Sequence, residues 1–397
     1  MTDPLRLSLN KRRNLLKLRV PAFFKSKKLQ IAVGSIILYL AAAGVSYMVF
    51  NAVLKKPFDI KTPFGNLTDV TSGSEEGTKD KPCPLNGVLY TKSREEQWKQ
   101  RKPLGFMVEN HVDARPPLGL SRADIIYEAV AEGGITRFLA IYLCQDAGDV
   151  ASIRSARTYF LDWVAEYDAA YAHVGGANTP GPADALGQIR DYEIRDMDQF
   201  GLGFPTYWRG TDKLAPHNVH STTKKLWDAA KDRGFGPEND KGVRWDKDFV
   251  IWKFKDDASI NGRGDQKPIS VPFWPQAPDY TVTWKYDKTS NVYQRFHQET
   301  AQIDPITKEQ MSAKNVIIQF ETERIANDGY PDGHLLYGTI GSGKTLIFQD
   351  GKVIEGKWVK GSRTSRTKFI DSSAKEIELN RGLVWIQTIP VGNKVEY

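Results

Sequence analysis

Residues 101–144 have the sequence RKPLGFMVENHVDARPPLGLSRADIIYEAVAEGGITRFLAIYLC, and this stretch sets the first part of the fold. It contains three short apolar runs, Leu104–Val108, Ile125–Val130 and Phe138–Cys144. Short apolar runs bounded by Gly, Pro and charged residues are typical of β-strands. The segment therefore predicts three strands, with charged side chains gathered in the connections between them.

The residues that follow add helices to this sheet. Apolar residues recur at spacings of three and four between Arg154 and Ala170, which predicts a helix over that range. A second helix is predicted over Thr222–Arg233, and Gly234 is expected to end it.

The second half of the chain is rich in aromatic and β-branched residues, and turn residues separate its apolar runs. Asp350-Gly351 predicts a tight hairpin, because such a turn needs positive φ angles. The strands predicted in this half are Phe249–Phe254, Tyr280–Tyr286, Val316–Phe320, Thr345–Phe348, Val353–Val359 and Leu383–Ile389.

These elements predict an α+β fold in two domains. A mixed α/β N-terminal domain is expected over residues 83–255 and a β-rich C-terminal domain over residues 268–397. The boundary is placed in the loop Asp256–Lys267, which is rich in Gly, Asn and Asp.

The N-terminus predicts where the protein is located. Residues 29–54 have no charged side chain, and the preceding 28 residues carry nine Lys or Arg and one acid, Asp3. A helix of this length, at ~1.5 Å per residue, would cross a hydrocarbon core of ~30 Å. We expect a basic cytoplasmic tail (1–28), one transmembrane helix (29–54), a flexible spacer (55–82) and an extracytoplasmic body at the cell membrane.

A cleaved signal peptide is the alternative interpretation of this segment, because Ala41-Ala42-Ala43 is a small-residue site that a peptidase could cut. The apolar run continues to Leu54, however, whereas the apolar core of a signal peptide normally has about 7–15 residues. The length of the run favours an uncleaved anchor.

The charge balance argues against nucleic acid as a partner. The chain has 55 basic and 48 acidic residues, but residues 1–54 hold nine of the basic ones and one of the acidic ones. The remainder is nearly neutral, so the body has no basic excess with which to bind nucleic acid. The expected partners are the cytoplasmic membrane and a cell-wall polymer or envelope protein.

The two cysteines, Cys83 and Cys144, predict a disulfide that joins the start of the folded body to a strand end. Disulfides persist outside the cytoplasm. Neither cysteine belongs to a CxxC or Cys/His cluster, so we expect no metal at this position.

Residues 338–345, Gly-Thr-Ile-Gly-Ser-Gly-Lys-Thr, match the phosphate-loop pattern GxxxxGK[ST]. A phosphate loop needs a helix directly after it, because the helix N-terminus and the loop amides bind the phosphates. Here a predicted hairpin follows instead, so we expect no nucleotide despite the match.

Charged and polar residues between 109 and 157 form the predicted ligand-binding site. Arginines can bind an anionic group through two parallel hydrogen bonds. Glu128 and Glu132 could act as acid and base or hold a cation, and His173 is a further candidate for proton transfer. A structural ion-pair network is the competing interpretation of the same residues. The predicted ligand-binding residues are Glu109, Asn110, Arg115, Asp124, Glu128, Glu132, Arg137, Arg154, Ser155 and Arg157.

His217 and His220 are a candidate metal-binding pair. Two His residues three apart share a face only on a helix. Pro216 and Asn218 indicate a loop instead, so no metal and no other cofactor is expected.

Several runs resemble the YerB-like family of bacterial envelope proteins. They are Cys83–Gly87, Arg101–His111, Asp113–Pro116, Gly119–Glu128, Glu132–Phe138, Ile153–Arg157 and, in the second half, Gly341–Lys344 and Gly382–Gln387. The resemblance covers nearly all of residues 83–391 and implies a two-domain α+β fold outside the cytoplasmic membrane. It implies no activity. Members of the family are usually lipoproteins, whereas this chain has the predicted transmembrane helix.

Together these observations predict a membrane-anchored envelope protein that binds cell-wall material or a wall enzyme. The alternative is a hydrolase of an envelope polymer, with Glu128 and Glu132 as paired carboxylates about 5–9.5 Å apart. Salt bridges from both carboxylates to Arg137 and Arg154, with no open cleft, would argue against the hydrolase.

Overall fold

The structure is a computed structural model that describes residues 77–397. The predicted cytoplasmic tail, the predicted transmembrane helix and residues 55–76 of the predicted spacer lie outside this range. Within residues 77–397, no helix has the length and apolar character needed to cross a membrane.

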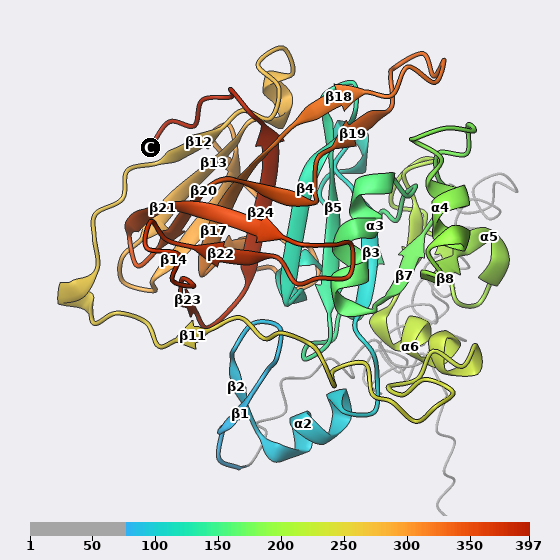
Figure 1. Cartoon of the computed structure of the whole chain (residues 1–397), viewed down its shortest axis with the longest axis horizontal. Helices are drawn as coiled ribbons and strands as arrows, with labels where there is room; N and C mark the ends of the chain where they lie inside the picture. Colours follow the sequence, from blue (N-terminus) through green and yellow to red (C-terminus); the bar gives the residue numbers. More distant parts are fainter. Residues whose placement is uncertain (1–76) are drawn as a thin grey trace, which may run out of the picture. The chain divides into compact units, whose positions relative to one another are not determined.

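A ten-stranded mixed sheet forms the centre of the body (Figure 1). Its strands, in their order across the sheet, are β22 (Lys368–Ile370), β21 (Lys352–Lys360), β20 (Gly341–Gln349), β17 (Asn315–Glu321), β24 (Val384–Pro390), β4 (Ile125–Glu132), β5 (Ile135–Tyr142), β3 (Leu104–Glu109), β7 (Ala170–His173) and β8 (Arg195–Asp198).

The two halves of the chain meet inside this sheet. β24 from the second half runs parallel to β4 from the first, with Val384 opposite Ile125. β17 in turn runs parallel to β24. The predicted α+β class is confirmed, with a mixed first part and a β-rich second part. The two parts share one continuous hydrophobic core.

A second, smaller sheet covers one face of the large one. Trp284 from the small sheet packs edge-on against Trp385 of β24, with ring centroids 5.2 Å apart, and donates a hydrogen bond to Gln387. The strands of this sheet are β12 (Ile269–Val271), β13 (Val282–Asp287), β14 (Val292–His297), β15 (Thr300–Ala301) and β16 (Ser312–Ala313).

Helix α3 (Thr158–Val164) packs on the opposite face of the large sheet, whereas α2 (Lys92–Trp98) lies beside β1 and β2 (Figure 1). Trp163 of α3 stacks on Tyr127 of β4 with ring centroids 5.0 Å apart. The helices are α2 (Lys92–Trp98), α3 (Thr158–Val164), α4 (Ala185–Asp191), α5 (Gln199–Leu202) and α6 (Thr223–Asp232), with 3-10 turns η2 (Val112–Ala114), η3 (Leu120–Arg122), η4 (Ala165–Tyr167), η5 (Ile260–Gly262) and η6 (Pro278–Tyr280).

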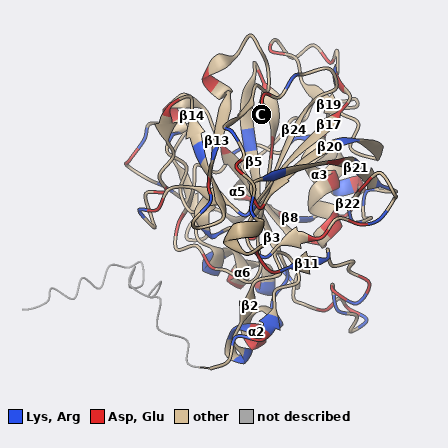
Figure 2. Cartoon of the chain, turned by 90° about the vertical axis from the view of Figure 1, so that its left-hand side faces the viewer, with Lys and Arg blue, Asp and Glu red and all other residues tan. Residues whose placement is uncertain are grey.

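Short strands complete the body. They are β1 (Lys81–Pro82), β2 (Leu89–Tyr90), β6 (Val150–Ala151), β9 (Trp208–Arg209), β10 (Val219–Ser221), β11 (Phe254–Lys255), β18 (Glu323–Ile325), β19 (Leu335–Tyr337) and β23 (Leu379–Asn380). Basic and acidic residues are interspersed over the body, and α2, for example, carries both kinds (Figure 2).

The hairpin predicted at Asp350-Gly351 is confirmed. It joins β20 to β21, and both residues have positive φ, 52° and 66°. The phosphate-loop pattern at 338–345 runs into β20, and Lys344 pairs with Glu355 on the neighbouring strand. No helix follows the pattern, so the local structure lacks the helix N-terminus that a phosphate loop requires.

The helix predicted over Arg154–Ala170 begins later than expected. Arg154 and Ala156 donate backbone hydrogen bonds to Met107 and Gly175, each 2.9 Å long, so this segment is extended. α3 starts only at Thr158, and after the 3-10 turn η4 the chain enters β7 at Ala170. The apolar spacing marked the buried helix face correctly, but it could not show that tertiary hydrogen bonds hold the first residues extended.

The strand predicted over Phe249–Phe254 is wrong for most of its length, because only Phe254 belongs to a strand, β11. The aromatic residues of this run are anchored as side chains instead. Trp252 donates a hydrogen bond of 2.7 Å to the carbonyl of Thr367, and Phe249 packs on Trp245.

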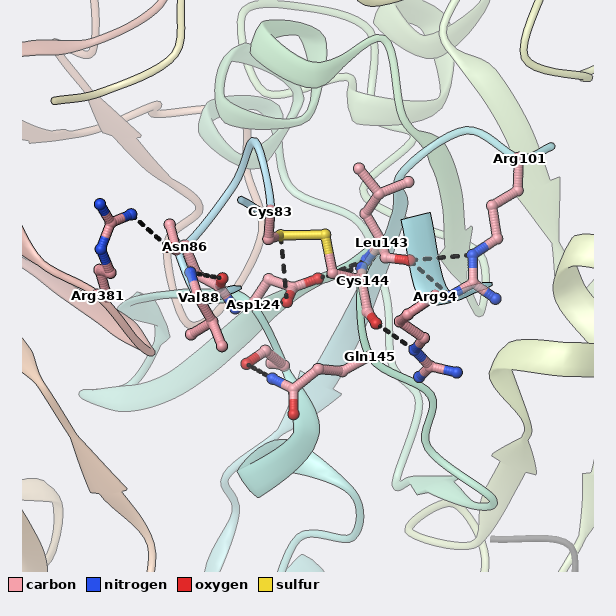
Figure 3. Close-up of a disulfide and its surroundings, with 12 residues drawn as sticks. Cys83, Asn86, Val88, Arg94, Arg101, Asp124, Leu143, Cys144, Gln145 and Arg381 are labelled. Carbon is pink, nitrogen blue, oxygen red and sulfur yellow. Dashed lines mark hydrogen bonds between the residues drawn. A yellow bond between two sulfur atoms is a disulfide. The ribbon is translucent and has the colours of Figure 1, made fainter. Parts of the chain in front are cut away.

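The predicted disulfide between Cys83 and Cys144 is present, with the two Cα atoms 6.1 Å apart (Figure 3). Asp124 lies beside it and accepts hydrogen bonds from the backbone of Leu143 and Cys144 and from the side chain of Asn86. These hydrogen bonds fix the end of β5 to the residues that follow Cys83. Burial raises the pKa of Asp124 to about 6.

Candidate functional site

Six of the predicted binding residues line one pocket of about 490 Å³. They are Glu109, Glu132, Arg137, Arg154, Ser155 and Arg157. The other lining residues are His111, Gly133, Ile135, Pro216, His217, Tyr330 and Asp332. We call this site the arginine pocket.

Several residues of the arginine pocket lie at the ends of strands of the large sheet. Glu109 is the last residue of β3 and Glu132 the last of β4. Arg137 lies near the start of β5, directly opposite Glu109. The extended segment 154–157 passes along the same edge because Arg154 is hydrogen-bonded to Met107 of β3. Strand ends on a rigid sheet are a common position for functional side chains.

A β-bulge decides which face Glu132 points to. The pairing of β4 with β5 shifts register between Val130 and Glu132. One extra residue reverses the alternation of side chains. Glu128 therefore contacts Thr136, whereas Glu132 contacts Arg137, the next residue of β5. Successive residues of a strand face opposite sides, so the two carboxylates lie on opposite faces of the sheet.

Glu132 joins two arginines. It accepts hydrogen bonds from Nε of Arg157 and, at 3.1 Å, from Nη2 of Arg137. Burial alone raises the pKa of Glu132, but the charges of Arg137 and Arg157 outweigh burial and bring the pKa below its ordinary value. Glu132 is thus a fixed carboxylate anion at neutral pH and cannot donate a proton as a general acid there.

Glu109 holds the other side of the pocket. Its Oε1 accepts a hydrogen bond from Nε of Arg154 at 3.1 Å, and its Oε2 lies 2.9 Å from Nδ1 of His217. The Glu109 side chain is buried, at 4% exposure, whereas that of Arg154 is 25% exposed. Glu109 therefore fixes the inner end of the Arg154 guanidinium and leaves its outer end facing the pocket.

The pocket retains hydrogen-bond donors that the described residues do not satisfy. Among residues 77–397, the terminal nitrogens of Arg154 have no hydrogen-bond acceptor, and neither does the buried Nε of Arg137. A guanidinium with two free N–H groups matches the geometry of a carboxylate or phosphate. The arrangement can bind an anionic group.

Five predicted residues lie outside this pocket. Asn110 bonds to Thr136 behind the pocket, and Arg115 stacks on Tyr280 at the edge of two neighbouring pockets. Asp124 lies beside the disulfide. His173 is fully buried, and its two ring nitrogens are bonded to Gly175 and Asp196. Its position fits a structural side chain rather than proton transfer.

Glu128, the remaining predicted residue, lies between the two sheets. It pairs with Arg295 at 2.6 Å, and both side chains are fully buried. Thr136, Trp385 and Gln387 donate its other hydrogen bonds. With every oxygen occupied and no exposure, Glu128 has no access to a substrate.

A larger pocket, of about 940 Å³, adjoins at His217. It contains His220, whose ring bonds to Asp149 and Asp212 at 3.0 Å each. Burial alone lowers the pKa of His220, but the two carboxylates outweigh burial and raise the pKa. The two histidines have different partners: His220 bonds to Asp149 and Asp212, and His217 bonds to Glu109.

We favour the arginine pocket as the functional site, because the N–H donors of Arg154 and Arg137 have no acceptor there among the described residues.

Sequence reasoning missed His111, His217, Tyr330 and Asp332 as pocket residues. His111 follows Glu109 and Asn110 directly, so its position after a strand end was a usable signal. Tyr330 and Asp332 come from the connection between β18 and β19, and only the joint sheet brings that connection to the first half of the chain.

Comparisons with known proteins agree with this architecture. A family described as "Protein of unknown function (DUF3048)" matches with its N-terminal domain over residues 90–236 and its C-terminal domain over residues 269–386. All the residues that line the arginine pocket fall within these two ranges.

A curated relative from Bacillus subtilis (strain 168), named "Putative lipoprotein YerB", is 29% identical over 323 residues, which cover 81% of this chain and 91% of the relative. The crystal structure of YerB protein from Bacillus subtilis is similar with a TM-score of 0.66 and 26% identity, and the match covers 80% of this chain and 100% of that chain. The shared domains, the curated relative and the shared fold place this chain in the YerB-like family of two-domain proteins of unknown function.

Proposed function

We propose that this chain is an extracytoplasmic envelope protein, anchored in the cytoplasmic membrane by residues 29–54, that binds acidic groups of a cell-wall polymer in the arginine pocket. The observation that carries the binding proposal is the guanidinium of Arg154, fixed at one end by Glu109 and open at the other. The disulfide and the relationship to a protein named as a lipoprotein support a location outside the cytoplasm.

The hydrolase alternative has less support. Two-carboxylate glycoside hydrolysis needs both carboxyl groups to flank one scissile bond in a shared cleft, about 5–9.5 Å apart. Here Glu128 and Glu132 lie on opposite faces of a sheet, and each is held by arginine. Neither carboxylate of this pair is free to act on a shared substrate.

Co-sedimentation with purified wall material tests the binding proposal. The full chain in detergent is mixed with wall sacculi that retain their phosphate-bearing polymers and with sacculi from which those polymers have been stripped. We expect the chain to sediment with the first and not with the second. Arg154→Ala should abolish sedimentation, whereas Arg190→Ala, which removes an exposed arginine of α4, should not. Equal sedimentation with both wall preparations would contradict recognition of acidic groups.

Accessibility in intact cells tests the topology. Glu96 and Lys267 are exposed on the folded body. After substitution by Cys, each should react with a maleimide that does not cross membranes. Protection of both positions until the cells are lysed would place the body in the cytoplasm and contradict the proposed location.

A further inference from the structure

Two histidines lie face to face at the rim of the arginine pocket. The rings of His111 and His217 are stacked, with centroids 4.9 Å apart and an angle of 14° between their planes. Asp113 lies in the turn η2 that follows His111. Each of the three side chains offers a ligand atom, and these atoms all lie within 4.8 Å of one another.

The spacing within this group suits a metal ion. Nδ1 of His111 lies 3.5 Å from a carboxylate oxygen of Asp113. Two ligands that each lie ~2.0–2.2 Å from a tetrahedral zinc ion are about 3.4 Å apart. The side chain of Asp113 is 70% exposed, so it can turn toward an ion without disturbing the core. The backbone N–H of Asp113, which now donates to His111, can be hydrated at this exposed turn.

Glu109 orients the third ligand. Its hydrogen bond to Nδ1 of His217 leaves Nε2 of that ring without a partner among the described residues. Arg154 holds the other oxygen of Glu109, so the carboxylate cannot rotate away. A buried carboxylate bonded to the far nitrogen of a histidine is the usual support for a zinc-ligating imidazole.

We infer that His111, Asp113 and His217 bind one Zn²⁺ ion, and that Glu109 acts as the positioning residue for His217. Imidazole ligands favour zinc over magnesium and calcium, which prefer oxygen. Three protein ligands leave a fourth position that water, or an anionic ligand of the arginine pocket, can occupy. Along the sequence His217 is nearest to His220, in a loop that does not suit a shared ligand face, whereas the fold brings His217 to His111.

Zinc titration of the full chain, freed of metal by chelation and dialysis, tests the inference by calorimetry. The remaining histidines are buried or bonded to carboxylates and both cysteines form the disulfide, so one ion should bind per chain. Asp113→Asn should weaken the affinity about tenfold or more, since even a lost supporting partner costs about 10–100-fold. His111→Asn should remove saturable binding. Mg²⁺ should not compete.

Asp240→Asn is the matched control, because Asp240 is an exposed carboxylate that lies outside the lining of the arginine pocket and outside the three ligands. Its zinc affinity should equal that of the unmodified chain. Absence of saturable zinc binding, unchanged affinity in Asp113→Asn, or an equal loss in Asp240→Asn would each overturn the inference. The titration contains no anionic polymer, so its outcome is independent of the proposed wall binding.

Discussion

At the scale of single residues, the structure separates charged side chains that stabilise the core from those that can meet a ligand. Glu128 and Arg295 are fully buried, whereas Arg154 keeps part of its guanidinium exposed. Glu128 and Arg154 look equivalent in the sequence, because charge and position along the chain do not reveal burial. The β-bulge after Val130, which reverses the direction of Glu132, has no signature in the residue types either.

Glu128→Ala should destabilise the protein strongly. Removal of this carboxylate leaves the Arg295 guanidinium buried without its counter-charge, which costs about 3–5 kcal/mol. Urea denaturation measures the loss. Glu96→Ala, a change of the same type on the exposed surface of α2, should cost less than about 0.5 kcal/mol. A similar small loss for both variants would show that Glu128 is not held as a core ion pair.

Glu321 predicts a pH dependence of stability. Burial raises its pKa to about 8, so the folded state holds a proton that the unfolded state releases above the ordinary value of 4.5. The contribution of this group to stability therefore falls as the pH rises from about 4.5 to about 8. Between pH 5 and pH 8 the free energy of unfolding of the unmodified chain should fall by up to a few kcal/mol. That of Glu321→Gln should not show this fall.

Denaturation of both proteins at pH 5 and pH 8 measures this difference. The pKa of Asp124 is also raised by burial, to about 6. Both proteins contain Asp124, so its effect on stability cancels in the comparison. Glu355→Gln, on the exposed surface of β21, serves as the control and should behave like the unmodified chain. Parallel loss of stability in Glu321→Gln and the unmodified chain would show that Glu321 titrates normally.

At the scale of elements, the sequence predicted most central strands and the α6 helix, because their apolar periodicity reflects the faces that they bury. Thr222–Arg233 was predicted as a helix, and α6 covers Thr223–Asp232. The failures lie where long-range contacts override local pattern. Residues 154–157 are extended because of hydrogen bonds to Met107 and Gly175, which lie on other strands or loops. That extended segment delivers Arg154 and Arg157 to the pocket.

The disulfide ties the segment after β1 to the end of β5 across a sequence separation of 61 residues. A cross-link of this span restricts the unfolded chain, and its loss typically costs about 2–5 kcal/mol. The double variant Cys83→Ser, Cys144→Ser should therefore unfold at a lower urea concentration than the unmodified chain. Unchanged stability in the double variant, or two free thiols in alkylated native protein, would contradict the disulfide.

At the scale of the whole molecule, the pattern of apolar runs and turn residues predicted an α+β protein with a β-rich second half, and the fold agrees. The shared sheet could not be predicted, because parallel pairing of β24 with β4 joins residues from opposite ends of the body. Six of the ten predicted binding residues nonetheless line one pocket, because they cluster near strand ends that meet at one edge. Tyr330 and Asp332 reach the pocket only through that shared sheet.

The central claim is that the arginine pocket binds an acidic ligand through Arg154. Calorimetric titration of the full chain with soluble poly(glycerol phosphate) tests it most directly, with Arg154→Ala and the control Arg190→Ala measured in parallel. A charged hydrogen bond contributes about 1.5–3 kcal/mol, so Arg154→Ala should weaken binding about tenfold or more and shift the melting temperature by only a few degrees. Arg190→Ala should bind like the unmodified chain. If Arg154→Ala binds the polymer as tightly as Arg190→Ala does, the arginine pocket is not the binding site.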